Sequence, residues 1–188
     1  MYYFLNFLTY SRIILTPILV WLILIDQYSA AGFVFIYCSL SDLFDGKIAR
    51  KYNLVSEKGN YLDPLADKIL MIGTLTSLLM QGLVVFWAYF IIIGRDILIT
   101  FYRNYMLAKN TPLVTSKFGK WKTASQHIAV IFCLLCFPEA FQGQQFYPFY
   151  EFTNGLQVYY LETLNLIFGL NAVYSAFTGI HYVWKNGF

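Results

Sequence analysis

The chain has 188 residues, of which 59% are hydrophobic and only 12% are charged. An ordinary soluble domain carries about 25% charged residues, so this composition excludes that class and indicates an integral membrane protein with one domain over residues 1–188. The net charge of +3 comes with no basic run, which gives no support for a nucleic-acid partner.

Six apolar runs follow one another along the chain. A transmembrane helix needs about 20 predominantly apolar residues to cross about 30 Å of hydrocarbon. The runs that approach or exceed this length cover about residues 4–25, 30–49, 60–80, 83–107, 120–138 and 155–184. We therefore expect an all-α integral membrane protein with six transmembrane helices.

The distribution of positive charge predicts how these helices are oriented. Six crossings place both termini on one side of the membrane, together with segments 50–59 and 108–119. All thirteen Lys and Arg residues lie at or near that side, whereas the opposite segments hold Asp26, Glu139 and Glu151 but no basic residue. Because positive residues accumulate in cytoplasmic loops, we expect both termini to face the cytoplasm.

The first apolar run carries three polar residues at a spacing of three. Asn6, Thr9 and Arg12 precede Pro17 and would lie roughly on one stripe of a helix. The simpler interpretation is a polar helix start with an arginine whose charged end reaches water along its aliphatic stem. The spacing alone leaves a structural and a functional role open.

Four aspartates mark the second and third runs. They lie in the segments D-L-F-D-G-K-I-A-R and, eight residues later, G-N-Y-L-D-P-L-A-D. Asp42 and Asp45 are three residues apart, so both project from one face of a helix. Gly59, Asp63 and Asp67 follow at steps of four along another helical face. Two such helices facing each other would form a cage of four carboxylates.

These carboxylates need compensation within a membrane. One ionised residue near the bilayer centre costs about 2.5–3.5 kcal/mol on insertion scales, so four unpaired ones would cost on the order of 10 kcal/mol. Clustered hard oxygen ligands suit Mg²⁺, Mn²⁺ or Ca²⁺, which favours a divalent-metal site. The alternative is that Asp42 and Asp45 only end a helix, with Arg50 and Lys51 as counter-ions.

Charged residues return in the fourth apolar run and at the start of the fifth. Arg95 and Arg103 are eight residues apart, which separates them by about 80° around a helix and lets both line one groove. Asp96 could simply pair with a basic neighbour. Lys120 and Lys122 precede an apolar run, where juxtamembrane basic residues attract anionic lipid headgroups.

The complete pattern D-x-x-D-G-x-x-A-R, eight residues, G-x-x-x-D-x-x-x-D resembles the signature of the CDP-alcohol phosphotransferase family. The resemblance implies six transmembrane helices around a polar cavity that opens to the cytoplasm, usually in a homodimer. It also implies two divalent ions, Mg²⁺ or Mn²⁺, with the ligands Asp42, Asp45, Asp63 and Asp67. Asp67 would in addition act as the general base. The residues implied in binding the CDP-linked lipid are Asp45, Gly46, Ala49, Arg50 and Gly59.

Three further segments resemble the phosphatidylglycerophosphate synthase branch of that family, namely I-x-x-G-R-D, the following Y-R, and G-K-x-K-T. In that branch a basic cluster receives the phosphate of the acceptor. The corresponding residues here are Arg95, Arg103, Lys120 and Lys122. The stripe that ends at Arg12 would border the active-site cavity in a supporting role. The expected reaction transfers a phosphatidyl group from CDP-diacylglycerol to sn-glycerol 3-phosphate and releases CMP.

Other functions stay open from the sequence. Within the same superfamily, a cardiolipin synthase or another transferase would use a different acceptor alcohol. From a different class, the carboxylates could coordinate a permeating ion in a cation channel or transporter, although transporters often contain inverted repeats and none is visible here. The resemblance favours a transferase in the inner membrane of a bacterial cell, with CDP-diacylglycerol, glycerol 3-phosphate and membrane lipid as partners.

Overall fold

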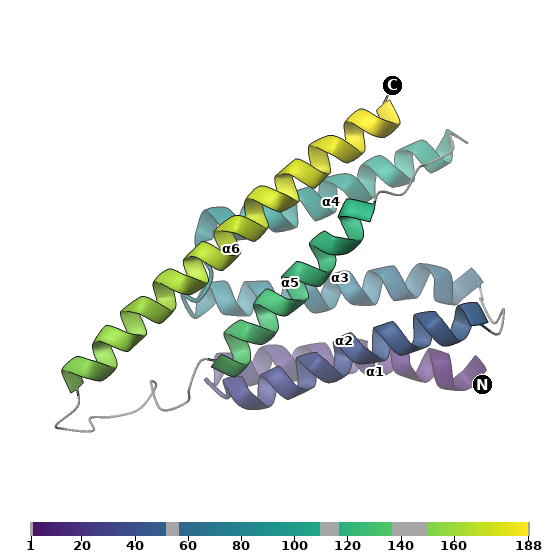
Figure 1. The fold of residues 1–188 in the computed structure, drawn as a ribbon. Helices are drawn as coiled ribbons and strands as arrows, with labels where there is room; N and C mark the ends of the chain where they lie inside the picture. The colour runs from purple at the N-terminus through teal and green to yellow at the C-terminus, as the bar shows by residue number, and fades with distance from the viewer. Residues whose placement is uncertain (1, 52–56, 110–116, 137–149, 188) are drawn as a thin grey trace. The chain divides into compact units, whose positions relative to one another are not determined.

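The computed structural model describes residues 2–51, 57–109, 117–136 and 150–187, and the side chains of 11–41, 65–106, 108–109, 118–136 and 159–186. Its helices are α1 (Tyr2–Leu24), α2 (Tyr28–Lys51), α3 (Glu57–Met80), α4 (Phe86–Ala108), α5 (Lys117–Cys136) and α6 (Tyr150–Gly187) (Figure 1). Each helix coincides with one of the expected apolar runs, in the same order. The all-α prediction is therefore confirmed for the described residues.

The contacts within the chain divide it into two compact units. One comprises Met1–Gln81 with Ile131–Pro148, and the other comprises Gly82–Val130 with Phe149–Phe188. We call them the α1–α3 unit and the α4–α6 unit, and α5 contributes residues to both. The expectation of a single domain over residues 1–188 stays a prediction.

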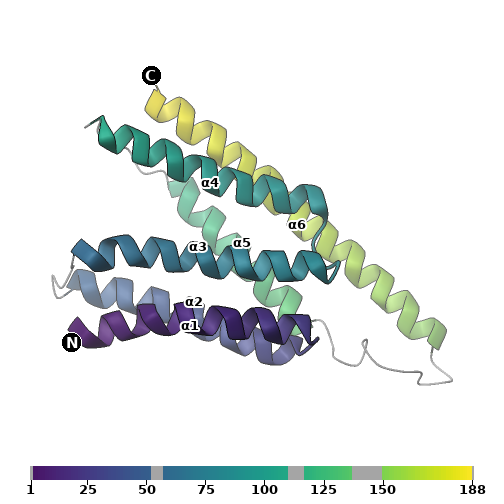
Figure 2. The same cartoon turned by 180° about the vertical axis from the view of Figure 1, so that it is seen from behind.

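In the α1–α3 unit, α1 packs against both α2 and α3 (Figures 1 and 2). The core between them is apolar: Leu19, Phe35 and Leu75 are each at most 1% exposed. Close packing of such side chains gains many van der Waals contacts between the helices. Apolar packing is thus the main attraction among the described parts of these three helices.

Two contacts fix the register of α1 against α3. A Cβ added at Gly73 would lie 3.2 Å from Thr16 Cγ2, so the two helices approach closely there. Nearer the helix ends, the Gln81 side-chain amide donates to the Ile23 carbonyl oxygen at 2.9 Å and to Asp26 Oδ1 at 2.9 Å. At these two contacts the residue numbers rise in the same direction along both helices, so α1 and α3 are parallel.

In the α4–α6 unit, α4 and α6 are also parallel. Near the start of the contact, a Cβ added at Gly169 would lie 3.2 Å from the ring of Trp87. Further along both helices, the Tyr102 and Tyr182 rings are 6.3 Å apart in an edge-on arrangement.

The first part of α5 runs along α6 in the opposite direction. The Phe118 and His181 rings are 5.3 Å apart, and one and a half to two turns later Ser125 Oγ donates to Asn171 Oδ1 at 2.8 Å. Increasing residue numbers on α5 thus pair with decreasing numbers on α6. This antiparallel contact brings the basic start of α5 beside the second half of α6.

Among the described residues, one helical segment, Tyr159–Asn186 of α6, is long and apolar enough by length and composition to cross a membrane. Two shorter apolar helices are Ser11–Leu24 and Tyr28–Ser41. Three charged residues on α4, namely Arg95, Asp96 and Arg103, lower its hydropathy. Six crossings and a cavity open to the cytoplasm remain predictions.

Candidate active site

The aspartate motif lies on helical backbone, as its spacing predicted. α2 and α3 include all of its positions, so Asp42 and Asp45 share one face of α2, and Asp63 and Asp67 share one face of α3. Several residues assigned to metal or CDP-lipid binding lie outside the described side chains: Asp42, Asp45, Gly46, Ala49, Arg50, Gly59 and Asp63. The side chains of Asn6 and Thr9 lie outside them too.

The chemistry of the four aspartates fits a hard divalent cation. Carboxylates without a His or Cys companion favour Mg²⁺ or Mn²⁺ over zinc. Among the described residues, no group of three or more His, Cys, Asp or Glu lies together as a metal site requires. Only Asp67 of the four expected ligands belongs to that set, so the metal site stays a prediction.

Arg12 is placed at the level of this motif. Its side chain is 1% exposed, which rules out an arginine whose charged end reaches water. Thr16 lies beside Gly73. At a rise of about 1.5 Å per residue, Arg12 lies about 6 Å before Thr16 on α1, and Asp67 lies about 9 Å before Gly73 on α3. Arg12 and Asp67 therefore occupy nearly the same level of the α1–α3 unit, and the supporting role of Arg12 stays a prediction.

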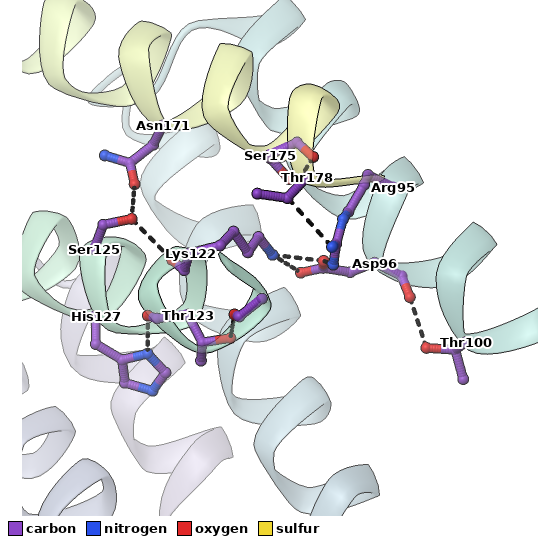
Figure 3. Close-up of polar contacts among 11 residues, drawn as sticks. Arg95, Asp96, Thr100, Lys122, Thr123, Ser125, His127, Asn171, Ser175 and Thr178 are labelled. Atoms are coloured by element: carbon purple, nitrogen blue, oxygen red, sulfur yellow. Dashed lines mark hydrogen bonds and ion pairs between the residues drawn. The ribbon is translucent and has the colours of Figure 1, made fainter. Parts of the chain in front are cut away.

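A second group of charged side chains joins α4, α5 and α6 (Figure 3). Lys122 Nζ lies 2.5 Å from both carboxylate oxygens of Asp96 and donates to them. Arg95 Nη1 donates to Asp96 Oδ1 at 3.1 Å, and Arg95 Nη2 donates to the Thr178 hydroxyl at 3.3 Å. We call Arg95, Asp96, Lys122 and Thr178 the Asp96 cluster.

The Asp96 cluster is largely shielded from solvent. The Lys122, Arg95 and Asp96 side chains are 2%, 16% and 30% exposed. Among the described contacts, two cations, Arg95 and Lys122, face the Asp96 carboxylate. Shielded cations are stabilised by nearby anions, so a phosphate would be favourable beside them.

Gly179 on α6 allows Arg95 to reach this position. A Cβ added at Gly179 would lie 2.9 Å from Arg95 Cγ and 3.4 Å from Arg95 Nε. The aliphatic stem of Arg95 therefore rests directly on the backbone of α6. Arg95 Nε is buried and has no hydrogen-bond acceptor among the described residues.

The structure brings together two of the four residues predicted to bind the acceptor phosphate. Arg95 and Lys122 meet at Asp96, which confirms the pairing of Asp96 with a basic neighbour. Arg103 and Lys120 are exposed, and within the described part of the chain no ion pair joins either to the Asp96 cluster. Whether any of these residues binds phosphate stays a prediction.

Sequence reasoning missed a polar stripe on α6. Asn171, Ser175 and Thr178 follow at steps of four and three, which places them on one helical face. The Thr178 hydroxyl donates to the Ser175 carbonyl oxygen at 2.9 Å, and both side chains are at most 2% exposed. Their helical spacing inside an apolar run was a signal that could have identified this face.

Comparison with known proteins identifies the family. The family model for CDP-alcohol phosphatidyltransferase matches residues 3–166, a range that contains both aspartate segments and three of the four residues of the Asp96 cluster. The chain is 33% identical over 133 residues to the CDP-diacylglycerol–glycerol-3-phosphate 3-phosphatidyltransferase of Rickettsia typhi, which covers 69% of this chain and 75% of that protein. It is 34% identical over 114 residues to the protein of the same name from Mycoplasma genitalium, covering 61% of this chain.

A third relative carries a different name. The chain is 35% identical over 138 residues to the cardiolipin synthase (CMP-forming) / mitochondrial hydrolase fusion protein of Schizosaccharomyces pombe, which covers 64% of this chain. The chain spans 23% of the length of that protein and about half, 48%, of the Mycoplasma relative. The family match covers most of the chain and agrees with the aspartate pattern: this chain belongs to the CDP-alcohol phosphatidyltransferase family, a family of transferases.

Proposed function

We propose that this protein is a membrane-embedded CDP-diacylglycerol–glycerol-3-phosphate 3-phosphatidyltransferase. It would transfer the phosphatidyl group of CDP-diacylglycerol to sn-glycerol 3-phosphate and release CMP. The observation that carries the proposal is the family match over residues 3–166 together with an aspartate motif in which all eight positions are present. The Rickettsia and Mycoplasma relatives carry the name of this activity, which supports the choice of reaction.

The four aspartates would bind the nucleotide end of the CDP-lipid. Asp42, Asp45, Asp63 and Asp67 would hold two divalent ions, Mg²⁺ or Mn²⁺, and the chemistry that these ions supply is neutralisation of the pyrophosphate charge. Asp67 would also take the proton of the acceptor hydroxyl. The acceptor oxygen then forms a bond to the phosphorus that carries the diacylglycerol, while the bond from that phosphorus to CMP breaks.

Small residues beside the aspartates would leave room for the nucleotide. Gly46 lets a ligand approach the helix backbone, where a side chain would obstruct it. Ala49 and Gly59 have the same effect through their small size, and Arg50 would contact a phosphate. Arg12, buried at the level of Asp67, would support this site from α1.

The Asp96 cluster supports glycerol 3-phosphate as the acceptor. A phosphomonoester brings nearly two negative charges, whereas phosphatidylglycerol, the acceptor of a cardiolipin synthase, has no phosphomonoester. The two cations that face Asp96 suit the former. Arg103 and Lys120, which are exposed, would attract the phosphate toward the site.

A membrane location is supported by the outward-facing apolar side chains. Trp21, Phe33, Phe101 and Ile180 are between 59% and 72% exposed, and they come from four different helices. Extensive exposed apolar surface is unfavourable in water and is expected against lipid. We propose that the six helices cross the inner membrane of a bacterial cell around a polar cavity, with both termini cytoplasmic, and that the protein forms a homodimer.

An acceptor panel tests the proposal. Purified protein would be incubated with CDP-diacylglycerol, Mg²⁺ or Mn²⁺, and one candidate acceptor at a time, and CMP release would be measured with identification of the lipid product. We expect glycerol 3-phosphate to give the fastest release and phosphatidylglycerophosphate to be the product. Ion transport without CMP release would instead favour the channel or transporter class.

Cardiolipin synthase is the second candidate. The observation that favours it is the 35% identity to the Schizosaccharomyces pombe protein of that name. Its acceptor would be phosphatidylglycerol, and its product would be cardiolipin. Faster CMP release with phosphatidylglycerol than with glycerol 3-phosphate would make it the better assignment.

A further inference from the structure

Lys122 and Arg95 do not face Asp96 in the same way. Lys122 Nζ is 2.5 Å from both carboxylate oxygens, and its side chain is 2% exposed, so Asp96 directly opposes its charge. Arg95 reaches one of these oxygens at the longer distance of 3.1 Å and turns its other terminal nitrogen to Thr178. Lys122 and Asp96 thus form the closer pair, and Arg95 is the cation that lies beside it (Figure 3).

The surroundings of Arg95 fix its side chain in place. Gly179 receives its aliphatic stem, and the Thr178 hydroxyl accepts from Nη2. The Thr178 hydroxyl in turn donates to the Ser175 carbonyl oxygen. Two buried polar atoms in this region, Arg95 Nε and Ser175 Oγ, have no hydrogen-bond partner among the described residues. A guanidinium that is held in this way is suited to a phosphate or another tetrahedral anion.

We propose that Lys122 is a positioning residue, which neutralises Asp96 and so leaves the charge of Arg95 to the acceptor phosphate. Without Lys122, the Asp96 carboxylate would cancel the charge of Arg95 and repel the phosphate. Lys122 and Asp96 therefore compensate each other. This inference rests on the proposed function only for the identity of the phosphate compound, because the charge arrangement itself would suit any phosphate monoester.

Four proteins distinguish a positioning lysine from a phosphate-binding lysine: the wild type, Lys122→Gln, Asp96→Asn and the double variant. We expect Lys122→Gln to raise the KM for glycerol 3-phosphate by at least about 30-fold, because it leaves Asp96 unopposed beside Arg95. The double variant removes both charges and should return this KM to within about fivefold of the wild type. The KM for CDP-diacylglycerol should change by less than about threefold in all of them.

The matched control is Lys109→Gln, which removes the exposed lysine that directly follows α4 and whose Nζ lies 4.5 Å from the centre of the Tyr105 ring. We expect this variant to keep both KM values. A double variant that binds glycerol 3-phosphate as poorly as Lys122→Gln would overturn the inference, since Lys122 would then contact the phosphate itself.

A binding measurement separates this inference from the proposed function. Inorganic phosphate would be added to each protein in detergent with a metal chelator, and the rise in thermal unfolding midpoint would be recorded. We expect the unfolding midpoint to rise for the wild type and the double variant but not for Lys122→Gln. If Lys122→Gln does not fold, the double variant alone tests the inference, because a rise there supports it and no rise overturns it. No rise for the wild type would overturn the inference. The expected pattern, combined with transfer only to a phosphate-free alcohol, would overturn the proposed acceptor and leave the inference intact.

Discussion

The two units bury polar side chains in different ways. In the α1–α3 unit, the buried hydroxyls of Thr16 and Thr74 donate to carbonyl oxygens of their own helices at 2.8 and 2.7 Å. In the α4–α6 unit, polar contacts cross between helices, as in the Asp96 cluster and in the bond from Ser125 to Asn171. The buried threonines of the first unit are therefore satisfied within their own helices, and its contact from Gln81 to Ile23 and Asp26 lies at the helix ends. The charged groups of the second unit depend on a partner helix.

Because of this difference, different substitutions should lower the stability of the two units. A hydroxyl that bonds to its own helix can be lost without leaving another helix unsatisfied, so the described core of the α1–α3 unit depends mainly on packing. A charged contact between helices leaves an uncompensated group when one member is removed. The stability of the α4–α6 unit should therefore change when a charge is removed and when an anionic ligand binds.

Removal of divalent metal has the largest expected effect, and it should affect the two units unequally. A chelator should abolish CMP release, and Mg²⁺ or Mn²⁺ should restore it, because the four aspartates would lose the ions that neutralise the pyrophosphate. The stabilisation of the protein by inorganic phosphate, assigned to the α4–α6 unit, should persist in the chelator. Full turnover in metal-free buffer would contradict the carboxylate cage.

Replacement of the proposed general base comes next. Asp67→Asn should reduce turnover by about 10²- to 10⁴-fold while part of the binding of CDP-diacylglycerol is kept, since three carboxylates remain. Turnover and equilibrium binding of the CDP-lipid measure the two effects separately. The control is Glu162→Gln, at an exposed position of α6, which should behave as the wild type. Near-normal turnover of Asp67→Asn would mean that another residue is the base.

A smaller effect is expected where Arg95 rests on α6. In Gly179→Ala, the new Cβ would lie 2.9 Å from Arg95 Cγ and displace the guanidinium. The KM for glycerol 3-phosphate should rise by about 3- to 10-fold, with turnover at saturation little changed. Gly94→Ala is the matched control, because a Cβ there meets nothing within 4 Å. Equal effects of the two substitutions would show that the contact at Gly179 does not position Arg95.

The smallest effects test the comparison of the two units through stability. Ser125→Ala removes a bond between helices and should lower the free energy of unfolding by about 1–2 kcal/mol, because Asn171 Oδ1 loses its donor. Thr74→Val keeps the shape of a buried side chain and removes a bond within one helix, so it should cost less than about 0.5 kcal/mol. Denaturant titrations in detergent would measure both. A larger loss of unfolding free energy in Thr74→Val than in Ser125→Ala would contradict the distinction between the units.

The helices could be predicted from the sequence because each one is a long apolar run, and the observed bounds differ from the expected ones by only a few residues. The aspartate motif could be predicted because its residues are close in sequence and helical geometry fixes their spacing. The burial of Arg12 could not, since it depends on how α1 packs against its neighbours.

The Asp96 cluster shows where sequence reasoning ends. The basic residues Arg95 and Lys122 were identified, but the partner of Asp96 lies 26 residues away on another helix, and Thr178 lies 83 residues from Arg95. The sequence contains no signal for such pairings, because they depend on the register between helices. The role of Gly179 is likewise visible only when the stem of Arg95 is seen to rest on it.

In the proposed reaction the two substrates are bound by different groups, the CDP-lipid by the aspartates of α2 and α3 and the acceptor phosphate by Arg95. The most direct test is the KM for both substrates, measured side by side on Asp63→Asn and Arg95→Gln. Asp63→Asn should raise the KM for CDP-diacylglycerol by at least about tenfold and leave that for glycerol 3-phosphate nearly unchanged. Arg95→Gln should do the reverse, with a rise of about 10- to 100-fold for glycerol 3-phosphate. Loss of CDP-diacylglycerol binding in Arg95→Gln, or equal effects of each variant on both substrates, would contradict this division.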